Sequence, residues 1–204
     1  MGLLCGGALP ATAAPAPPPP KLLVVGDSLS AEYGLRRGSG WVALLNTRLL
    51  QEVPAAQVVN ASISGDTTAG GRSRLPALLQ QHRPTHVVIE LGANDALRGL
   101  PLAMTEANLR AMTRACQAAG AKVLLIGMQV PPNYGGPYTR DFQALFSQVA
   151  RTEKTALVPF LLAGIADDNN PAQWFQADRL HPNEAAHPRI ADTVWAVLRP
   201  WIKR

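Results

Sequence analysis

The stretch that decides the fold is KLLVVGDSLSAEYG, residues 21–34, in which a hydrophobic run ends at a glycine and is followed by an acid and a hydroxyl. The run 22–26 has the composition of a strand that is buried on both faces. In an open α/β sheet, ligands bind just beyond the carboxyl ends of the strands. Ser28 is therefore either a cap of the following turn or helix, or a nucleophile. Asp27 is expected to hydrogen-bond backbone groups in the turn.

Length, composition and charge limit the class of protein. The chain has 204 residues, of which 47% are hydrophobic and 16% are charged, and this suits one globular domain with a sizeable core. The net charge is +5, but the basic residues are scattered and form no long run that would bind nucleic acid or a membrane. No stretch reaches the roughly 18 apolar residues of a membrane span. We expect no nucleic-acid partner and no stable membrane insertion, and the sequence does not predict the oligomeric state.

The first twenty residues, MGLLCGGALPATAAPAPPPP, differ from the rest of the chain because they carry no charge. Their apolar part and the small residues of ATAAPA resemble the hydrophobic region and cleavage site of a secretory signal, although the positive start is missing. We predict a secretory leader with a proline-rich spacer over 1–20, a single domain over 21–204, and a periplasmic or secreted location. Without the leader, Cys116 is the one remaining cysteine, so we expect no intramolecular disulfide.

Short apolar runs alternate with helical patterns along the rest of the chain. The runs span 22–26, 57–62, 86–92, 122–128 and 156–159. The helical patterns span 40–52, 69–82, 105–120 and 138–153, and a last helix is expected to start near Pro188. Thr105 with Asn108 is expected to cap the third helix. The alternation predicts crossover connections, a five-stranded parallel sheet and a three-layer α/β/α sandwich.

A serine hydroxyl becomes a nucleophile when a base removes its proton and a third group holds that base. Of the four histidines, His82 and His86 precede the third strand at the amino end of the sheet. His187 stands at a helix start, where a cap or surface role is expected. His181, in DRLHPNE, stands three residues after Asp178, so the carboxylate can turn back onto the imidazole. This pair is either the acid–base partner of the serine or a local surface pair.

A tetrahedral oxyanion needs preorganised hydrogen-bond donors. Gly65, in SISGDTT, offers a backbone N–H or is simply a turn glycine. Asn94, in GANDA, offers a side-chain amide or caps the following turn, and the N–H of Ser28 is a third candidate donor. Because all three positions follow predicted strands, we expect them at one edge of the sheet. The residues predicted to contact the substrate beside them are Asp27, Leu29 and Leu97.

These motifs resemble the SGNH (GDSL) hydrolase family. The four named residues of that family match GDSLS, the glycine after the second strand, GxND and DxxH, which here are Ser28, Gly65, Asn94 and His181, with Asp178 as the third member of the triad. The likeness runs from Lys21 onward. The blocks VVNASISGDTT, RLPALLQQHRP, ELGANDALRG and HPNEAAHPRIAD resemble the bacterial periplasmic subgroup of multifunctional thioesterases, arylesterases and lysophospholipases. The resemblance implies a flavodoxin-like SGNH hydrolase fold.

We therefore predict a serine esterase that cleaves carboxylic esters through an acyl-enzyme, without metal or organic cofactor. Aryl esters, short to medium acyl chains and lysophospholipids are the expected substrates. Loops 96–101 and 130–138 are predicted to border an acyl groove, and the resemblance implies that the first moves on substrate binding. An acyl-CoA thioesterase and a non-catalytic lipid- or carbohydrate-binding module remain as alternatives. An α/β-hydrolase is disfavoured because GDSLS is not G-x-S-x-G and the acid and base stand three residues apart.

One position departs from the pattern of the subgroup, which usually has a small residue where Glu32 stands in SAEYG. A carboxylate so close to the serine in the chain is expected to hinder access to the nucleophile or to discourage anionic substrates. The departure affects the predicted specificity more than the predicted mechanism.

Overall fold

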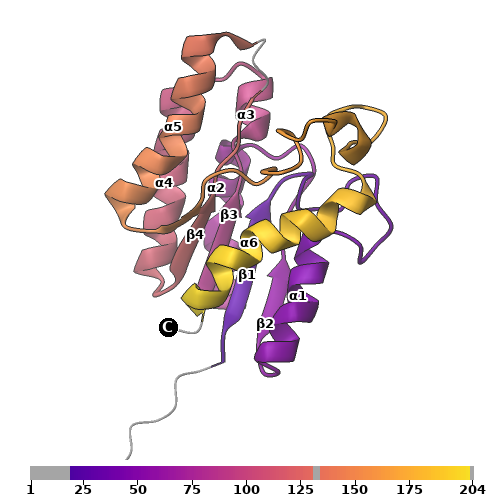
Figure 1. Cartoon of the computed structure of the whole chain (residues 1–204). Coiled ribbons are helices and arrows are strands. Elements are labelled where there is room, and N and C mark those ends of the chain that lie inside the picture. The colour runs from indigo at the N-terminus through magenta and orange to yellow at the C-terminus, as the bar shows by residue number, and fades with distance from the viewer. Residues whose placement is uncertain (1–18, 131–133, 203–204) are drawn as a thin grey trace, which may run out of the picture.

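The protein is built around a five-stranded parallel sheet with the order β2-β1-β3-β4-β5, seen in a computed structural model that describes residues 19–130 and 134–202 (Figure 1). The strands are β1 (Lys21–Gly26), β2 (Gln57–Asn60), β3 (His86–Glu90), β4 (Lys122–Ile126) and β5 (Ala156–Val158). Each strand overlaps one of the apolar runs, and every neighbouring pair is parallel. The predicted sheet is confirmed.

Helices cover both faces of this sheet. On one face α1 (Trp41–Glu52) packs against α6 (His187–Ile202) (Figure 1). On the other face lie α2 (Thr68–His82), α4 (Leu102–Ala118) and α5 (Gly136–Glu153), each in contact with the next. The three-layer sandwich is confirmed. A short helix, α3 (Ala93–Leu97), follows β3 in a segment predicted to be mostly loop, and the 3₁₀ turns η2 (Pro171–Trp174) and η3 (Glu184–Ala186) precede α6.

The neighbouring interior strands β1 and β3 carry a fully buried part of the core. Residues 22–25 of β1 and 87–89 of β3 are all at most 1% exposed. Strands that are covered on both faces need apolar side chains on both, which explains why these runs are continuous rather than alternating. Truncating a leucine in such a position typically removes about 2–5 kcal/mol of stability. The core therefore holds the strand ends, where the polar motifs begin, in fixed positions.

The predicted cap of the third helix is wrong. The helix starts three residues earlier, directly after Pro101, whose fixed φ of −59° suits a helix start. The Thr105 hydroxyl lies inside the helix and donates to Asp95 Oδ1 at 3.2 Å. The Asn108 amide donates to Thr68 Oγ1 at 3.1 Å. Both side chains thus belong to a buried polar network between α2, α3 and α4 rather than to a helix end.

The strand order places a topological switch point between β1 and β3. From β1 the chain passes to β2 on one side and then returns to β3 on the other, and ligands of open α/β sheets bind beyond such a point. The register pairs Gly26 with Glu90 at this edge. The segments that follow β1, β2 and β3 therefore meet at one place.

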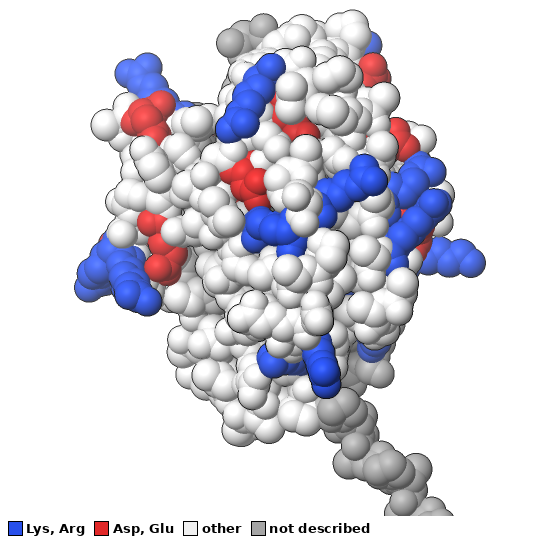
Figure 2. Space-filling model, turned by 180° about the vertical axis from the view of Figure 1, so that it is seen from behind, with Lys and Arg blue, Asp and Glu red and all other residues white. Residues whose placement is uncertain are grey.

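Charge and hydropathy of the described residues add two observations. On the face seen in Figure 2, Lys and Arg side chains stand in several separate places with acidic side chains among them. Within the described ranges, no helix combines the length and apolarity needed to cross a membrane. Residues 1–18 of the predicted leader lie outside the described residues.

Candidate active site

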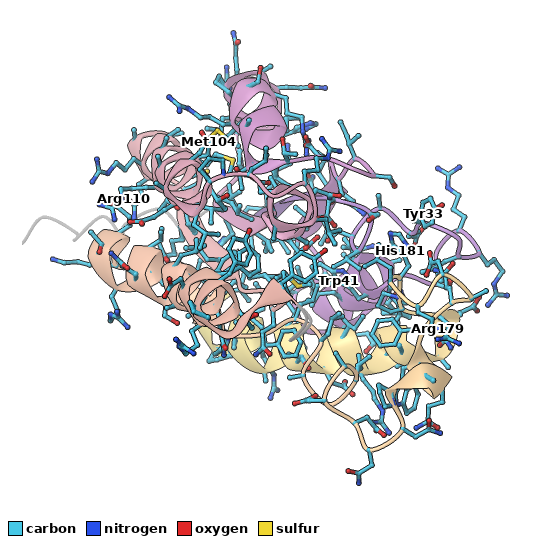
Figure 3. The ribbon with its side chains drawn as sticks, turned by 90° about the horizontal axis from the view of Figure 1, so that it is seen from above. Tyr33, Trp41, Met104, Arg110, Arg179 and His181 are labelled. Atoms are coloured by element: carbon cyan, nitrogen blue, oxygen red, sulfur yellow. The ribbon has the colours of Figure 1, made fainter. Side chains whose placement is uncertain are left out.

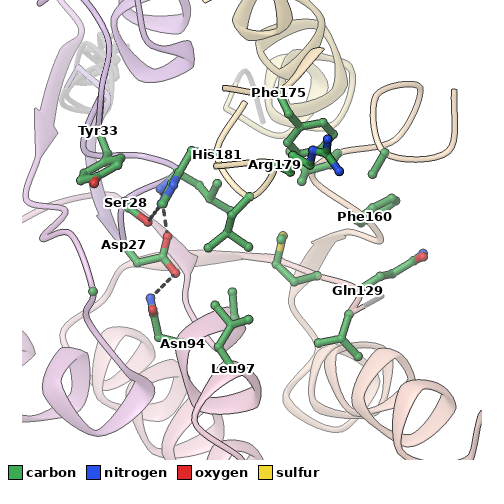
Figure 4. A pocket seen from close by; sticks show the side chains of 18 of the residues that line it. Asp27, Ser28, Tyr33, Asn94, Leu97, Gln129, Phe160, Phe175, Arg179 and His181 are labelled. Atoms are coloured by element: carbon green, nitrogen blue, oxygen red, sulfur yellow. Dashed lines mark hydrogen bonds between the residues drawn. The ribbon is translucent and has the colours of Figure 1, made fainter. Parts of the chain in front are cut away.

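Ser28 and His181 come from opposite ends of the chain and meet at the switch point. Ser28 lies in the turn after β1, and His181 lies in the loop that precedes α6. Ser28 Oγ is 2.9 Å from His181 Nε2, and His181 Nδ1 is 2.7 Å from Asp178 Oδ2. Figure 4 shows the serine and the imidazole facing each other across the end of the sheet. The Asp178–His181 contact is therefore part of a three-residue chain and not an isolated surface pair.

A tight turn holds Asp178 against the imidazole. Asp178 Oδ1 accepts hydrogen bonds from the N–H groups of His181 at 3.0 Å and Leu180 at 2.9 Å. Arg179, with a φ of +57°, lets the chain turn back within three residues. The His181 N–H, then the Leu180 N–H and the imidazole lower the pKa of Asp178 to about 2. An ionised Asp178 favours the tautomer in which Nδ1 carries the proton, which leaves Nε2 free to accept one from Ser28.

Ser28 and Gly65, whose backbone N–H groups are the predicted oxyanion donors, line one and the same cavity. Gly65 adopts a φ of +79°, a left-handed conformation that favours glycine. Its carbonyl accepts a hydrogen bond from Arg98 Nη2 at 2.7 Å, which fixes the peptide plane. Within the described ranges, the N–H groups of Gly65 and Ser28 have no acceptor. The geometry thus leaves both of them available as donors.

The side chain of Asn94 is already engaged. Its Nδ2 donates to Asp27 Oδ2 at 3.0 Å and to the carbonyl of Asp66 at 2.9 Å. The amide carries two hydrogens, so both are in use. Asn94 is close to the cavity, as predicted, but it reaches a substrate oxygen only by exchanging one of these bonds. Sequence reasoning missed this engagement because the partners lie 67 and 28 residues away along the chain.

A pair of buried acids lies under the nucleophile turn. Asp27 is 1% exposed and Glu90 is fully buried. Glu90 Oε2 accepts from Ser30 Oγ at 2.7 Å and from the N–H of Asp27 at 3.3 Å. Burial raises the pKa of Asp27 to about 6, and burial together with the charge of Asp27 raises the pKa of Glu90 well above its usual range. A Cβ on Gly26 would lie 2.8 Å from Glu90 Oε2, so the glycine at the end of β1 makes room for this carboxyl.

A cavity of about 750 Å³ opens beside the serine and the imidazole (Figure 4). Asp27, Leu29 and Leu97, the three residues predicted to contact the substrate, all line it. Asp27 also accepts a hydrogen bond from the N–H of Leu29 at 3.0 Å, as expected for its place in the turn. The apolar part of the lining comes mainly from Met128, Val130, Phe160, Leu162, Phe175 and Leu180. Residues 131–133 of the second predicted groove loop lie outside the described residues.

Glu32 is not among the residues that line this cavity, so the expected hindrance to the nucleophile is wrong. Its φ of +60° turns the carboxylate toward the start of α1, where it accepts from the N–H of Gly38 at 3.0 and 3.1 Å and of Gly40 at 2.9 Å. His187, which is 2% exposed, accepts from the N–H of Trp41 at 3.0 Å, and burial lowers its pKa. Both side chains satisfy donors at the start of α1, so His187 caps a different helix from its own and is not a surface residue.

Two other chemical possibilities concern groups elsewhere in the molecule. Cys116 is buried in the core, and burial raises the pKa of its thiol to about 12. The thiolate is the reactive form of cysteine, so this residue is inert, as its place in a helical pattern indicates. In the described part of the chain, no group of three or more His, Cys, Asp and Glu side chains is arranged to hold a metal ion.

Comparison with known proteins shows the family of the chain. Residues 24–189 match the model of the GDSL-like lipase/acylhydrolase family. The chain belongs to that family. This GDSL hydrolase is 54% identical over 179 residues to "Esterase TesA" of Pseudomonas aeruginosa, with 88% of each chain covered. It is 42% identical over 181 residues to "Thioesterase 1/protease 1/lysophospholipase L1" of Escherichia coli strain K12, covering 89% of this chain and 84% of the other.

A solved structure shows the same fold. The psychrotrophic esterase EstA from Pseudoalteromonas sp., inhibited by monoethylphosphonate, superposes with a TM-score of 0.84 and 41% sequence identity. The match covers 90% of this GDSL hydrolase and 99% of EstA. The predicted family and the predicted SGNH hydrolase fold are confirmed, and the chain is an ester-hydrolysing enzyme of the GDSL class.

Proposed function

We propose that this enzyme cleaves carboxylic esters through an acyl-enzyme formed on Ser28. The observation that carries the proposal is the chain of two short contacts from Ser28 Oγ to His181 and from His181 to Asp178. His181 Nε2 takes the hydroxyl proton while Oγ bonds to the acyl carbon. The bond to the leaving alcohol then breaks, and His181 gives the proton to that alcohol. Water attacks the acyl-enzyme in the same way, and its proton returns through His181 to Ser28.

The oxyanion of each tetrahedral intermediate would be held by three donors. The N–H groups of Ser28 and Gly65 have no competing acceptor in the described residues. Asn94 would supply the third by releasing Asp27 Oδ2 while it keeps its bond to the Asp66 carbonyl. The alkoxide-like oxyanion is far more basic than a carboxylate, even one whose pKa burial raises to about 6, so it is the stronger acceptor and the exchange becomes favourable as charge develops.

The cavity supports small and medium-sized apolar acyl groups as substrates. Its volume of about 750 Å³ is within the usual range for small-molecule sites, and most of its lining is apolar. We propose aryl esters, short to medium acyl esters and lysophospholipids as the substrate classes. Thioesters are the second candidate, because the name of one relative includes a thioesterase and the same machinery would serve both bonds.

The test is a substrate panel on wild-type enzyme and two serine variants. We expect Ser28→Ala to lower kcat by about 10³-fold or more, because the nucleophile is lost. Ser64→Ala, which changes another serine that lines the cavity, should stay within about threefold of wild type. The panel should contain p-nitrophenyl esters of increasing chain length and matched ester and thioester pairs. A folded Ser28→Ala variant with undiminished turnover contradicts the proposal, and so does a wild-type protein that binds these esters without turning any of them over.

We also propose that residues 1–20 form a secretory leader with a spacer, that 21–204 form the single hydrolase domain, and that the enzyme works outside the cytoplasm. The support is compositional, since the segment is free of charge and ends in four prolines, and the family match begins at residue 24. The amino-terminal sequence of the protein recovered from the medium or periplasm tests this. A mature protein that starts at Met1 contradicts it.

A further inference from the structure

Gln176 joins the two segments that carry Ser28 and His181. Its side-chain Nε2 donates to the carbonyl of Tyr33 at 2.9 Å and to the carbonyl of Pro182 at 3.0 Å. Tyr33 belongs to the turn that follows Ser28, and Pro182 directly follows His181. Gln176 also donates its backbone N–H to the carbonyl of His181 at 2.8 Å. One amide hydrogen of Gln176 therefore bonds to the segment of Ser28, and the other bonds to the segment of His181.

The side chain of Tyr33 rests against the imidazole. The two ring centroids of Tyr33 and His181 are 4.3 Å apart, with the planes inclined by 37°. Figure 3 shows the two residues beside each other, and Figure 4 shows Tyr33 on the side of the pocket where His181 faces Ser28. Because Gln176 holds the backbone of Tyr33, it also fixes the surface on which the imidazole lies.

The contacts of Asp178 do not join the His181 loop to the turn after β1. Its carboxylate bonds to Leu180 and His181, all within residues 178–181. Asp178 thus orients the imidazole within its own loop but does not tie that loop to the turn after β1. Tyr33 and Gln176 link the loop to the turn beside the imidazole. An exposed Arg36–Glu184 ion pair at 2.8 Å joins the same two segments farther along the chain.

A glycine in the turn after Ser28, Gly34, leaves room for the side chain of Gln176. Gly34 has a φ of +70°, and a Cβ added to it would lie 2.1 Å from Gln176 Oε1. Gly38, in the same segment, has a φ of +85°, but a Cβ there would meet nothing within 4 Å. Glu32 holds the other end of the segment through the N–H groups of Gly38 and Gly40. The chain therefore keeps a glycine beside the Gln176 amide for reasons of space as well as conformation.

We infer that Gln176 is a positioning residue for the ester hydrolysis proposed above, because it holds the Tyr33 turn and the His181 loop at the separation that brings Nε2 to Ser28 Oγ. The inference rests on the proposed function of Ser28 and His181. Gln176 itself does not touch the reacting atoms in this arrangement and acts through the imidazole.

The first experiment removes the two donated hydrogen bonds with Gln176→Leu. A displacement of the base by about 1 Å is enough to lower a rate by up to about 100-fold, so we expect kcat on a p-nitrophenyl ester to fall about 10- to 100-fold. KM should stay within about twofold because the lining of the cavity is otherwise kept. The matched control is Gln173→Leu, whose side chain makes one long contact of 3.4 Å to Asp168, and it should leave kcat unchanged.

The second experiment disturbs the contact of Gln176 with the Tyr33 turn by changing Gly34 in that turn. Gly34→Ala and Gly38→Ala introduce a side chain at similar left-handed positions, but only the first pushes against Gln176. We expect Gly34→Ala to lower kcat about tenfold more than Gly38→Ala. In the Gln176→Ala background the obstruction is gone, so Gly34→Ala should then cost no more than Gly38→Ala does. This non-additivity is the signature of the contact.

The outcomes separate this inference from the proposed function. A full kcat in folded Gln176→Leu, or equal losses of kcat in Gly34→Ala and Gly38→Ala, overturns the positioning role. The proposed function stands in that case as long as Ser28→Ala is inactive. Turnover by folded Ser28→Ala overturns the proposed function itself. If Gln176→Leu does not fold, the comparison of the two glycine variants and the double variant still decides the question.

Discussion

Two carboxyl groups near Ser28 have opposite environments. Asp178 lies in the last loop with 40% of its side chain exposed, and its pKa is lowered to about 2. Asp27 lies at the end of β1, is 1% exposed, and has its pKa raised to about 6. Both carboxylates accept hydrogen bonds from backbone N–H groups. Burial outweighs these hydrogen bonds at Asp27 and raises its pKa, whereas at the exposed Asp178 the hydrogen bonds prevail and lower its pKa.

This contrast assigns the two acids different tasks. Asp178 stays ionised at all ordinary pH values at little cost, because water and N–H donors stabilise its charge, so it can support an imidazolium on His181. Asp27 lies above the fully buried Glu90 and holds the Asn94 amide. The exposed Asp178 therefore orients the base His181. The buried Asp27 and Glu90 fix the side chain of Asn94 and the turn after β1.

Among variants of the acidic side chains, the largest effect on turnover is expected for Asp178→Asn. The amide group would face Nδ1 with a donor instead of an acceptor, so the imidazole loses the tautomer that accepts a proton from Ser28. We expect kcat to fall about 10²- to 10⁴-fold with a small change in KM, measured on a p-nitrophenyl ester at pH 7 to 8. Asp167→Asn, which changes another carboxylate that lines the cavity, should stay within about threefold. Equal activity of Asp178→Asn and wild type would remove the distinction between the two acids.

The candidate site could be predicted from the sequence where its chemistry lies in short, local patterns. Asp178 and His181 stand three residues apart, and their contact needs only one turn of chain. Ser28, Gly65 and Asn94 follow apolar runs, and parallel strands bring such positions to one edge. The same reasoning predicts the sheet, since continuous apolar runs require cover on both faces.

The residues that support the site could not be predicted, because their partners are distant in the chain. Gln176 meets Tyr33 across 143 residues, and Glu90 meets Ser30 across 60. Glu32 is the clearest case. Its position near Ser28 in the sequence suggested an effect on the substrate, but a left-handed φ turns its carboxylate toward α1 instead. Backbone conformation at a single residue decided the outcome.

A smaller effect on turnover is expected for Asp27→Asn. Asn94 would lose a carboxylate acceptor at 3.0 Å and meet an amide group, which disturbs the position of the candidate oxyanion donor. We expect kcat/KM at pH 8 to fall about 10- to 100-fold. Because the pKa of Asp27 is about 6, the wild-type carboxyl is itself protonated below that pH, so the ratio of wild type to variant should shrink as pH falls from 7 to 5. A ratio that stays constant across this range contradicts the assigned role.

The smallest effect on turnover, and the clearest effect on stability, is expected for Glu90→Gln. The amide oxygen can still accept from the Ser30 hydroxyl and the Asp27 N–H, so kcat should stay within about threefold of wild type. Its folded pKa is raised above the ordinary 4.5, so Glu90 contributes stability that is complete below that value and is lost as pH rises through the folded pKa. Asp178, whose pKa is lowered, has the opposite sign, and its contribution is lost as pH falls from about 4 toward 2.

The measurement for Glu90→Gln is the free energy of unfolding in urea at pH 5, 6, 7 and 8. One proton held only by the folded state gives a loss of up to about 1.4 kcal/mol per pH unit, so the wild type should lose stability over this range more steeply than the variant. Asp27, whose pKa burial raises to about 6 in the wild type, is present in both proteins and contributes to both slopes. Glu106→Gln, which removes a partly exposed carboxylate paired with Arg110 at 2.6 Å, should keep the wild-type slope. Parallel curves for wild type and Glu90→Gln would mean that Glu90 is ionised in the folded protein, and the contrast between an ionised loop acid and a protonated core acid would then fail.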